Sequence, residues 1–267
     1  MHDVMQYEVP VRLGIFFSVF VIMASLELIL PRRDLRASKS RRWGSNIGIT
    51  LINTIVVRLL FPTAAIGVAI TAEAEDLGLL NIVSLPFWLS VVTAVLLLDL
   101  AIYVQHVLMH KIPILWRLHR MHHVDLDIDV TTGARFHPVE IILSMLIKFA
   151  AIVVLGAPAL AVLIFEVLLN ATAMFNHSNV RLPLGLDRAL RTVLVTPDMH
   201  RVHHSVIRRE TDSNYGFNLP WWDRLFKTYR AQPEAGHKSM GIGVADIRDE
   251  KLCINLIGML KLPFLRS

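Results

Sequence analysis

Hydrophobic residues occupy long, nearly unbroken stretches of this chain. Residues 11–30 are apolar almost throughout and are about as long as the hydrocarbon core of a bilayer requires. Two more stretches share this character: 47–72, interrupted by Arg58 and Pro62, and 82–104. A cleaved signal peptide is the alternative for the first stretch, but no Lys or Arg precedes position 12 and no small-residue cleavage site follows. The pattern predicts three membrane-spanning helices.

Two apolar stretches in the second half differ in length. Residues 139–175 are too long for one helix and carry Gly156 and Pro158 near their middle, so they predict a hairpin of two short helices. Residues 251–264 are too short to span a bilayer and contain lysines at their edges, which predicts an interfacial helix. No repeat or low-complexity linker divides residues 1–267, so we expect a single membrane domain.

Charge is unevenly distributed between the predicted loops. Loop 31–42 holds six Lys/Arg and one acid, whereas loop 72–81 holds three acids and no base. Because basic loops stay in the cytoplasm, this places the N-terminus outside, and residues 105–138 and 176–267 in the cytoplasm. Overall, 54% of residues are hydrophobic, 18% are charged and the net charge is +5. The basic excess therefore reflects membrane topology, and no nucleic-acid partner is expected.

Ten of the twelve histidines lie between positions 106 and 204, in repeated spacings. They form an H-x3-H pair, two H-x2-H-H triplets and two singles: His106 and His110; His119, His122 and His123; His200, His203 and His204; His137 and His177. Helical residues three and four apart share a face, so each box should direct its imidazoles the same way. Ten imidazoles can supply five nitrogens to each of two metal ions. Because imidazole binds Fe, Zn, Cu and Ni, the ligand type alone does not identify the metal. His2 and His237 lie outside this pattern and are assigned no role.

Two functions that use clustered histidines can be compared with this pattern. A zinc-dependent membrane hydrolase would need a catalytic Glu beside a ligand, as in H-E-x-x-H, and no histidine box here has one. A metal transporter would carry its histidines within the spans, whereas these lie in predicted cap segments. Both functions therefore fit the histidine pattern poorly.

The ordered boxes, separated by a short membrane hairpin, resemble the fatty acid hydroxylase / sterol desaturase superfamily of integral membrane non-haem di-iron enzymes. The resemblance covers about residues 90–230. It includes Asp99 ahead of the first box and the closing segment Asn214-Tyr215-Gly216 … Trp222-Asp223-Arg224-Leu225-Phe226. The single histidines, His137 in RFHP and His177 in NHSN, resemble those of the sterol-oxidase and alkylglycerol-monooxygenase branches more than those of the acyl-hydroxylase branch. Val107, where many relatives have Arg, departs from the pattern.

The apolar stretches and the loop charges predict an all-α polytopic membrane bundle with a cytoplasmic histidine-rich helical cap. The resemblance implies two iron ions on the ten histidines, O₂ as co-substrate, and hydroxylation of a lipid C–H bond, with desaturation or alkylglycerol-type oxygenation as alternatives. Zinc would then reflect mis-metallation. Asp99 and Asp223 would orient imidazole N–H groups, with capping or ion pairing as the alternative. Electrons must come from an external carrier, which a basic surface at Arg188, Arg191, Arg208 and Arg209 could attract, although contact with anionic lipid explains that surface equally well.

Overall fold

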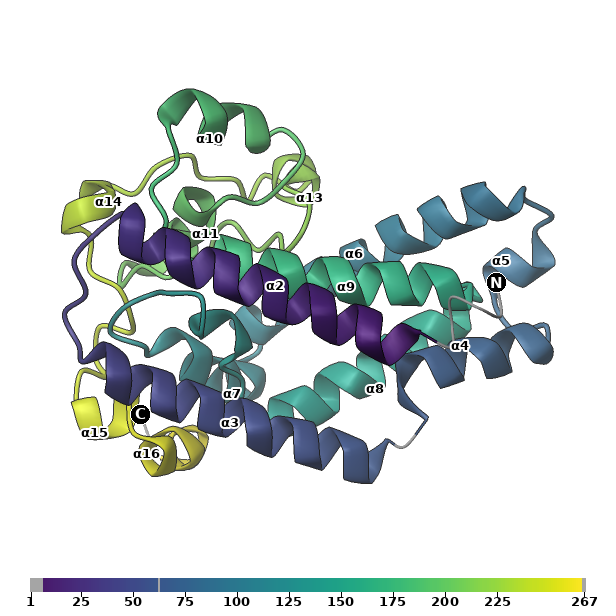
Figure 1. Cartoon of the computed structure of the whole chain (residues 1–267), viewed down its shortest axis with the longest axis horizontal. Coiled ribbons are helices and arrows are strands. Elements are labelled where there is room, and N and C mark those ends of the chain that lie inside the picture. The colour runs from purple at the N-terminus through teal and green to yellow at the C-terminus, as the bar shows by residue number, and fades with distance from the viewer. Residues whose placement is uncertain (1–6, 62, 266–267) are drawn as a thin grey trace.

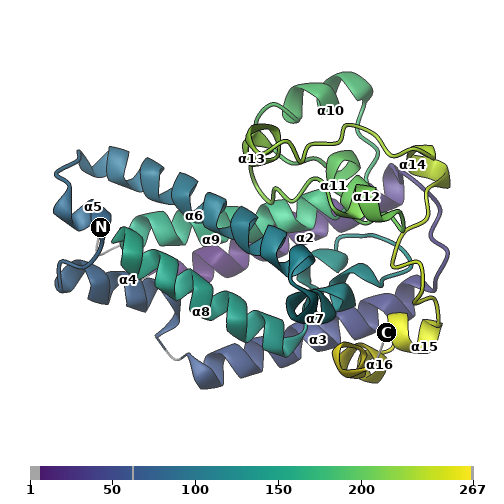
Figure 2. The ribbon, with the colours of Figure 1, turned by 180° about the vertical axis from the view of Figure 1, so that it is seen from behind.

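The structure, a computed structural model, describes residues 7–61 and 63–265, and over these residues it contains helices and three isolated β-bridges but no strand. The long helices run roughly along the longest axis of the molecule, and all the short helices except α5 gather at one end (Figures 1 and 2). The predicted all-α class is confirmed.

Five helical stretches among the described residues are long and apolar enough to cross a membrane. They are α2 (Glu8–Ile29), the stretch Lys39–Ile82, α6 (Phe87–Lys111), α8 (Pro138–Leu155) and α9 (Ala159–Asn176). The stretch Lys39–Ile82 consists of α3 (Lys39–Leu60), α4 (Ala64–Ala74) and α5 (Leu79–Ile82). Their outward side chains are largely apolar, which suits contact with lipid. The chain is therefore built as an integral membrane protein.

The predicted spans match these helices with two differences. Residues 47–72 were expected to form one span, but the helix breaks between Leu60 and Ala64. The third span begins at Phe87, directly after Pro86, and continues beyond position 104 to Lys111. Polar residues end a hydropathy signal, but they do not end the backbone hydrogen bonds of a helix. As a result, α6 carries the first two histidines of the boxes near its C-terminal end.

The predicted hairpin at 139–175 is present as α8 and α9, each 18 residues long. The turn between them needs a glycine, because Gly156 has a φ of 63° and an added Cβ would lie 2.7 Å from the Leu77 carbonyl oxygen. This tight turn packs the hairpin against the segment that joins α4 to α5. The hairpin returns the chain to the histidine-bearing end (Figure 2).

Small side chains bring the central helices together. Ala65 and Ala69 of α4, Ala94 of α6 and Ala161 of α9 are fully buried in one cluster with larger apolar residues such as Phe165. Small residues allow close approach of helix backbones in a membrane. This cluster packs α6 against α9, and these two helices lead to site residues.

The cap consists of short elements at one end of the bundle (Figure 1). They are α7 (Pro113–His123), η1 (Thr132–Ala134), α10 (Leu184–Leu190), α11 (Pro197–His203), α12 (Arg208–Thr211), α13 (Trp221–Leu225), α14 (Gly236–Ser239), α15 (Glu250–Cys253), α16 (Leu256–Lys261) and η2 (Leu262–Phe264). The basic α2–α3 loop lies at this end too, where Arg32 Nε is 2.9 Å from Asp198 Oδ1.

The C-terminal segment differs from the single interfacial helix predicted for residues 251–264. It breaks at Ile254, and Asn255 caps α16 by accepting hydrogen bonds from the backbone N–H groups of Ile257 and Gly258. Cys253 and Met259 are buried in a cluster that also includes residues of α3 and α7. The segment therefore packs onto the protein and closes the cap.

Candidate metal centre

Nine histidines meet where the long helices join the cap. The first group comprises His106 and His110 of α6, His119 and His123 of α7, and His203 of α11. The second comprises His122 of α7, His177 after α9, and His200 and His204 of α11 and its C-cap. In each group one nitrogen per ring lies within 4.8 Å of the others, and all nine residues are buried. The structure thus brings together nine of the ten histidines proposed from sequence.

Each H-x2-H-H triplet is divided between the two groups. His119 and His123 belong to the first group, and His122 belongs to the second. Adjacent residues on a helix are about 100° apart, so neighbouring imidazoles diverge. The expectation that a whole triplet points the same way was therefore wrong. Instead α7 and α11 each lie between the two groups and contribute to both.

The hydrogen bonds of the imidazoles leave bare nitrogens facing one another. His106 Nδ1 is 2.7 Å from the Tyr215 carbonyl oxygen, and His203 Nδ1 is 2.7 Å from the Ser213 carbonyl oxygen. A carbonyl can only accept, so both Nδ1 atoms donate and carry the ring protons. Their Nε2 atoms, unprotonated in neutral rings, nevertheless lie 3.0 Å apart. Two lone pairs at that distance repel unless a cation lies between them.

The second group repeats this arrangement. His122 Nδ1 donates to the Arg135 carbonyl at 3.1 Å, and His177 Nδ1 donates to the Ala173 carbonyl at 2.8 Å. Their Nε2 atoms lie 3.1 Å apart. His204 is fully buried, and neither of its ring nitrogens has a hydrogen-bond partner among the described residues. Unpartnered buried polar atoms are costly, so these positions fit metal ligands.

Burial keeps these imidazoles neutral. It lowers the pKa of His177 and of His203 to about 3, with neighbouring imidazoles also contributing. The pKa values of His122, His200 and His204 are lowered for the same reasons, burial first. Neutral imidazole is the form that binds metals. An all-nitrogen donor set of this kind suits iron, among other transition metals.

A carboxylate that sequence reasoning missed supports one ligand directly. Glu140, in the first turn of α8, places Oε1 2.6 Å from His119 Nδ1, and both residues are buried. Carboxylates in this position fix the ring orientation of a metal-binding histidine and raise its basicity. The available signal was an acid three residues after His137 in a predicted membrane helix, where a carboxylate needs a partner.

Asp99 and Asp223 have no hydrogen bond to an imidazole of the described residues, which differs from the role proposed for them. Asp99 Oδ2 accepts from Trp222 Nε1 at 2.8 Å and from the Leu219 N–H at 3.3 Å. Asp223 accepts from the N–H groups of Tyr215 and Gly216, each at 2.8 Å. Both therefore hold the loop whose Tyr215 carbonyl accepts from His106, and so support that ligand through the backbone.

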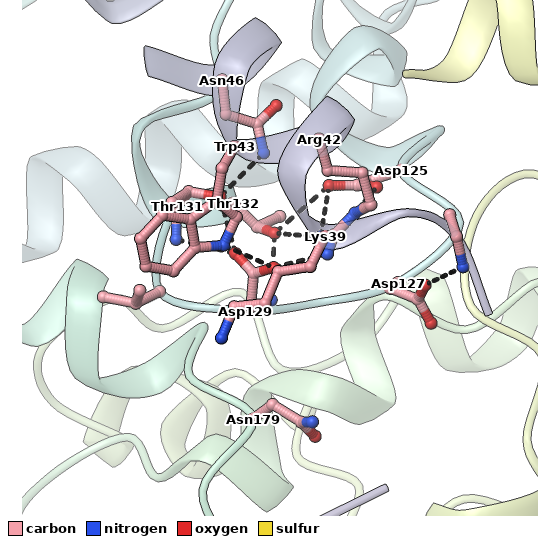
Figure 3. A network of polar contacts seen from close by, with 12 residues as sticks. Lys39, Arg42, Trp43, Asn46, Asp125, Asp127, Asp129, Thr131, Thr132 and Asn179 are labelled. Atoms are coloured by element: carbon pink, nitrogen blue, oxygen red, sulfur yellow. Dashed lines mark hydrogen bonds and ion pairs between the residues drawn. The ribbon is translucent and has the colours of Figure 1, made fainter. Parts of the chain in front are cut away.

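A buried polar network holds the loop between α7 and α8 (Figure 3). Arg42 of α3 is fully buried, with Nε 2.7 Å from Asp125 Oδ1 and a second ion pair to Asp129. Asn46 Nδ2 donates to Thr131 Oγ1 at 2.9 Å. The loop held in this way carries the Arg135 carbonyl that accepts from His122. Alternating acids at 125, 127 and 129 were the sequence signal, but Arg42, which pairs with the first and third of them, lies more than 80 residues earlier.

His137 lies outside both groups, so the structure brings nine of the ten proposed ligands together and leaves this one apart. It is the N-cap of α8, where its Nδ1 accepts from the Val139 N–H at 3.2 Å. Its Nε2 lies 3.3 Å from the Leu260 carbonyl oxygen. Both ring nitrogens are thus occupied by the backbone. His237 is likewise apart, with Nε2 3.0 Å from Gln232 Oε1, and His2 lies outside the described residues.

An apolar cavity of about 340 Å³ adjoins the first group. Its lining includes Val104, Val107 and Leu108 of α6 together with Tyr215 and Phe226, and the charged residues Lys111 and Asp212 also line it. The Tyr215 ring separates this cavity from the imidazoles, with its centroid 5.1 Å from that of His110. Val104 and Leu108 are exposed on the outside of the bundle. The cavity therefore lies between the lipid-facing surface of α6 and the histidines.

The comparison with protein families identifies this architecture. Residues 91–228 match the family described as fatty acid hydroxylase, which is more than half of the chain. The chain belongs to the fatty acid hydroxylase family. The matched region contains all nine grouped histidines as well as Asp99 and Asp223. Members of this membrane-associated family modify lipids, and the resemblance inferred from the histidine boxes is confirmed.

Three relatives illustrate the range of the family. The chain is 26% identical to ornithine lipid hydroxylase OlsE of Rhizobium tropici over 266 residues, which cover 95% of this chain and 75% of that protein. It is 28% identical to alkylglycerol monooxygenase of Xenopus tropicalis over 80% of this chain but only 47% of that protein. It is 26% identical to a cholesterol 25-hydroxylase-like protein of Danio rerio, over 84% of this chain and 94% of that protein. No solved structure matches the chain.

The basic surface proposed for an electron carrier is largely neutralised. Arg191 Nε lies 2.7 Å from Asp187 Oδ2, and Arg208 Nε lies 2.9 Å from Asp212 Oδ2. Arg209 pairs with Glu234. Of the four arginines named from the sequence, only Arg188 has no ion pair with another described residue. The surface around these arginines therefore carries both positive and negative charges and is not a basic patch.

Proposed function

We propose that the protein is an iron-dependent, O₂-using oxidoreductase that hydroxylates a C–H bond of a membrane lipid. The observation that carries this proposal is the pairing of bare Nε2 atoms, His106 with His203 and His122 with His177, at 3.0 and 3.1 Å. Two such groups of nitrogen donors can hold two iron ions, and bound iron would supply the redox chemistry that activates dioxygen. The named relatives act on lipids, which supports a lipid substrate.

The chain itself would hold the metals, exclude water and position the substrate. Nine buried imidazoles supply ligands, while Glu140 and the backbone carbonyls fix the ring orientations. The apolar cavity beside Tyr215 offers a lateral path from the bilayer, since Val104 and Leu108 face outward. An alkyl or acyl chain entering there would lie next to the first histidine group. The ornithine lipid, alkylglycerol and sterol names of the relatives leave the lipid class open.

The orientation follows from the positive-inside rule. The basic loop 31–42 lies at the histidine-bearing end, and the acidic segment 72–81 lies at the opposite end (Figure 1). We therefore infer that the metal centre faces the cytoplasm and that the N-terminus lies outside. An external carrier would deliver electrons on that side.

Metal analysis combined with lipid profiling tests the proposal. Protein purified from iron-replete cells should contain iron, and cells that express it should accumulate a lipid with one added oxygen. His200→Ala and His203→Ala should lose both properties, whereas His237→Ala, which alters a buried histidine outside the groups, should retain them. Loss of two hydrogens from a lipid would instead identify a desaturase. The proposal would be refuted if the His203→Ala strain accumulated the same oxygenated lipid as the wild-type strain and if the wild-type protein contained no iron.

A further inference from the structure

A second cavity, of about 350 Å³, lies apart from the histidine groups and is lined by an excess of basic residues. Its charged lining comprises Arg32, Arg33, Arg36, Arg181, Lys238 and one acid, Asp34. Arg32 is paired with Asp198. The remaining four cations have no ion pair among the described residues. Their charge therefore exceeds that of the single carboxylate in the lining.

The chain segments that form this cavity are held in a defined position. Pro31 and Val180 form an antiparallel bridge, in which the Arg32 N–H donates to the Asn179 carbonyl and the Arg181 N–H donates to the Leu30 carbonyl, each at 2.8 Å. This places the arginines of two distant segments side by side. The bridge therefore fixes the backbone positions from which Arg32 and Arg181 extend.

One of these arginines is buried with an unsatisfied donor. Arg33 is only 7% exposed, and its Nη1 donates to the Met240 carbonyl at 2.9 Å. Its Nε has no hydrogen-bond partner among the described residues. A buried guanidinium N–H without an acceptor is costly. Arg33, which lines the cavity, therefore adds a positive charge that no carboxylate of the described residues neutralises.

The position of the cavity indicates where the anion comes from. The α2 helix ends at Ile29 and α9 ends at Asn176, so both membrane-spanning helices finish next to this site. Leu28 and Ile29, at the end of α2, are 73% and 71% exposed, as expected for residues in hydrocarbon. Arg32 and Arg33 follow within a few residues, which is the level of the lipid headgroups.

We propose that this cavity binds the phosphate of an anionic phospholipid headgroup. The headgroup would lie against Arg33, Arg36, Arg181 and Lys238, with its acyl chains running along the exposed end of α2. Such a lipid would join the α2–α3 loop to α14, which lie beside each other in both views of the fold (Figures 1 and 2). This site is independent of the metal chemistry proposed above.

Lipid titration of the detergent-purified full chain tests the site. Short-chain phosphatidylglycerol should raise the thermal unfolding midpoint and remain bound in native mass spectrometry. Short-chain phosphatidylcholine and sodium phosphate should do neither at the same concentration. In the triple variant Arg36→Ala/Arg181→Ala/Lys238→Ala, the affinity for phosphatidylglycerol should fall roughly 100-fold. Each cation near a membrane surface contributes about 1 kcal/mol to the binding of an anionic lipid.

A charge-matched control separates this site from general electrostatic attraction. The triple variant Arg188→Ala/Lys227→Ala/Lys251→Ala removes three exposed cations that do not line the cavity and should bind within about twofold of the wild type. Equal weakening in both triple variants would overturn the proposal, as would equal protection by sodium phosphate, which would identify a soluble-anion site. If circular dichroism shows that the alanine variant is misfolded, the variant Arg36→Lys/Arg181→Lys replaces it and should still bind phosphatidylglycerol. Loss of lipid binding in this folded lysine variant would also count against the site.

Discussion

Replacing Glu140 should weaken metal binding while leaving the bundle folded. The Glu140 Oε1 atom lies 2.6 Å from His119 Nδ1, and both side chains are 3% exposed. Glutamine can still accept this hydrogen bond but has no negative charge, so the charge-assisted part of the interaction is lost. Alanine removes the acceptor altogether. Loss of such a supporting group typically costs about 10- to 100-fold in metal affinity, or about 1.4–2.7 kcal/mol.

We therefore expect Glu140→Gln to weaken metal affinity about tenfold and Glu140→Ala about 100-fold. Competition with a chelator of known affinity, followed by metal analysis of the purified protein, measures both. Glu166→Gln is the matched control, because this buried carboxylate on α9 pairs with Lys148 at 2.8 Å and with Arg12 at 3.0 Å, and contacts no histidine. Wild-type affinity in both Glu140 variants, or the same loss in the control, would refute the reasoning.

Three further substitutions test other parts of the centre. His137→Ala should retain all bound metal, because this residue caps α8, and should cost about 1 kcal/mol of stability in chemical unfolding; loss of metal would restore it as a ligand. Gly133→Ala places a Cβ 2.7 Å from the Ala173 carbonyl and 3.3 Å from His177 Nδ1, so metal analysis should show about half of the wild-type content per chain; full occupancy would contradict this. Arg42→Met leaves Asp125 and its neighbouring carboxylate buried without a cation and should destabilise the fold by about 3–5 kcal/mol in unfolding measurements, whereas an unchanged midpoint would show that those acids are protonated.

The spans and the histidine boxes are predictable because both are local patterns. A run of about 20 apolar residues identifies a span wherever it occurs. The hairpin of α8 and α9 was predicted in the same way, from its length and from Gly156. The break between α3 and α4 and the break within the C-terminal segment were not predicted, although Pro62 and Asn255 interrupt the apolar pattern at these two places. Hydropathy does not report where backbone hydrogen bonds are interrupted.

The supporting contacts could not be predicted because they join distant segments. Glu140 reaches His119 only because α8 packs beside α7. Arg42 pairs with Asp125 across more than 80 positions. For Asp99, the sequence indicated importance but not the partner, and a loop N–H and an indole took the place of the expected imidazole. Ion pairs and hydrogen bonds depend on three-dimensional proximity, which no spacing rule supplies.

By itself, the sequence determined that the protein is an all-α membrane bundle, that its histidines gather in boxes, and that the basic loop 31–42 marks one end. Only the tertiary structure decided how those histidines divide. It separated His122 from His123, placed His177 with the second group, and assigned His137 to a helix cap. The physical reason is that helical periodicity sets the direction of each imidazole around its own axis, whereas the packing of α6, α7, α9 and α11 against one another decides which imidazoles meet.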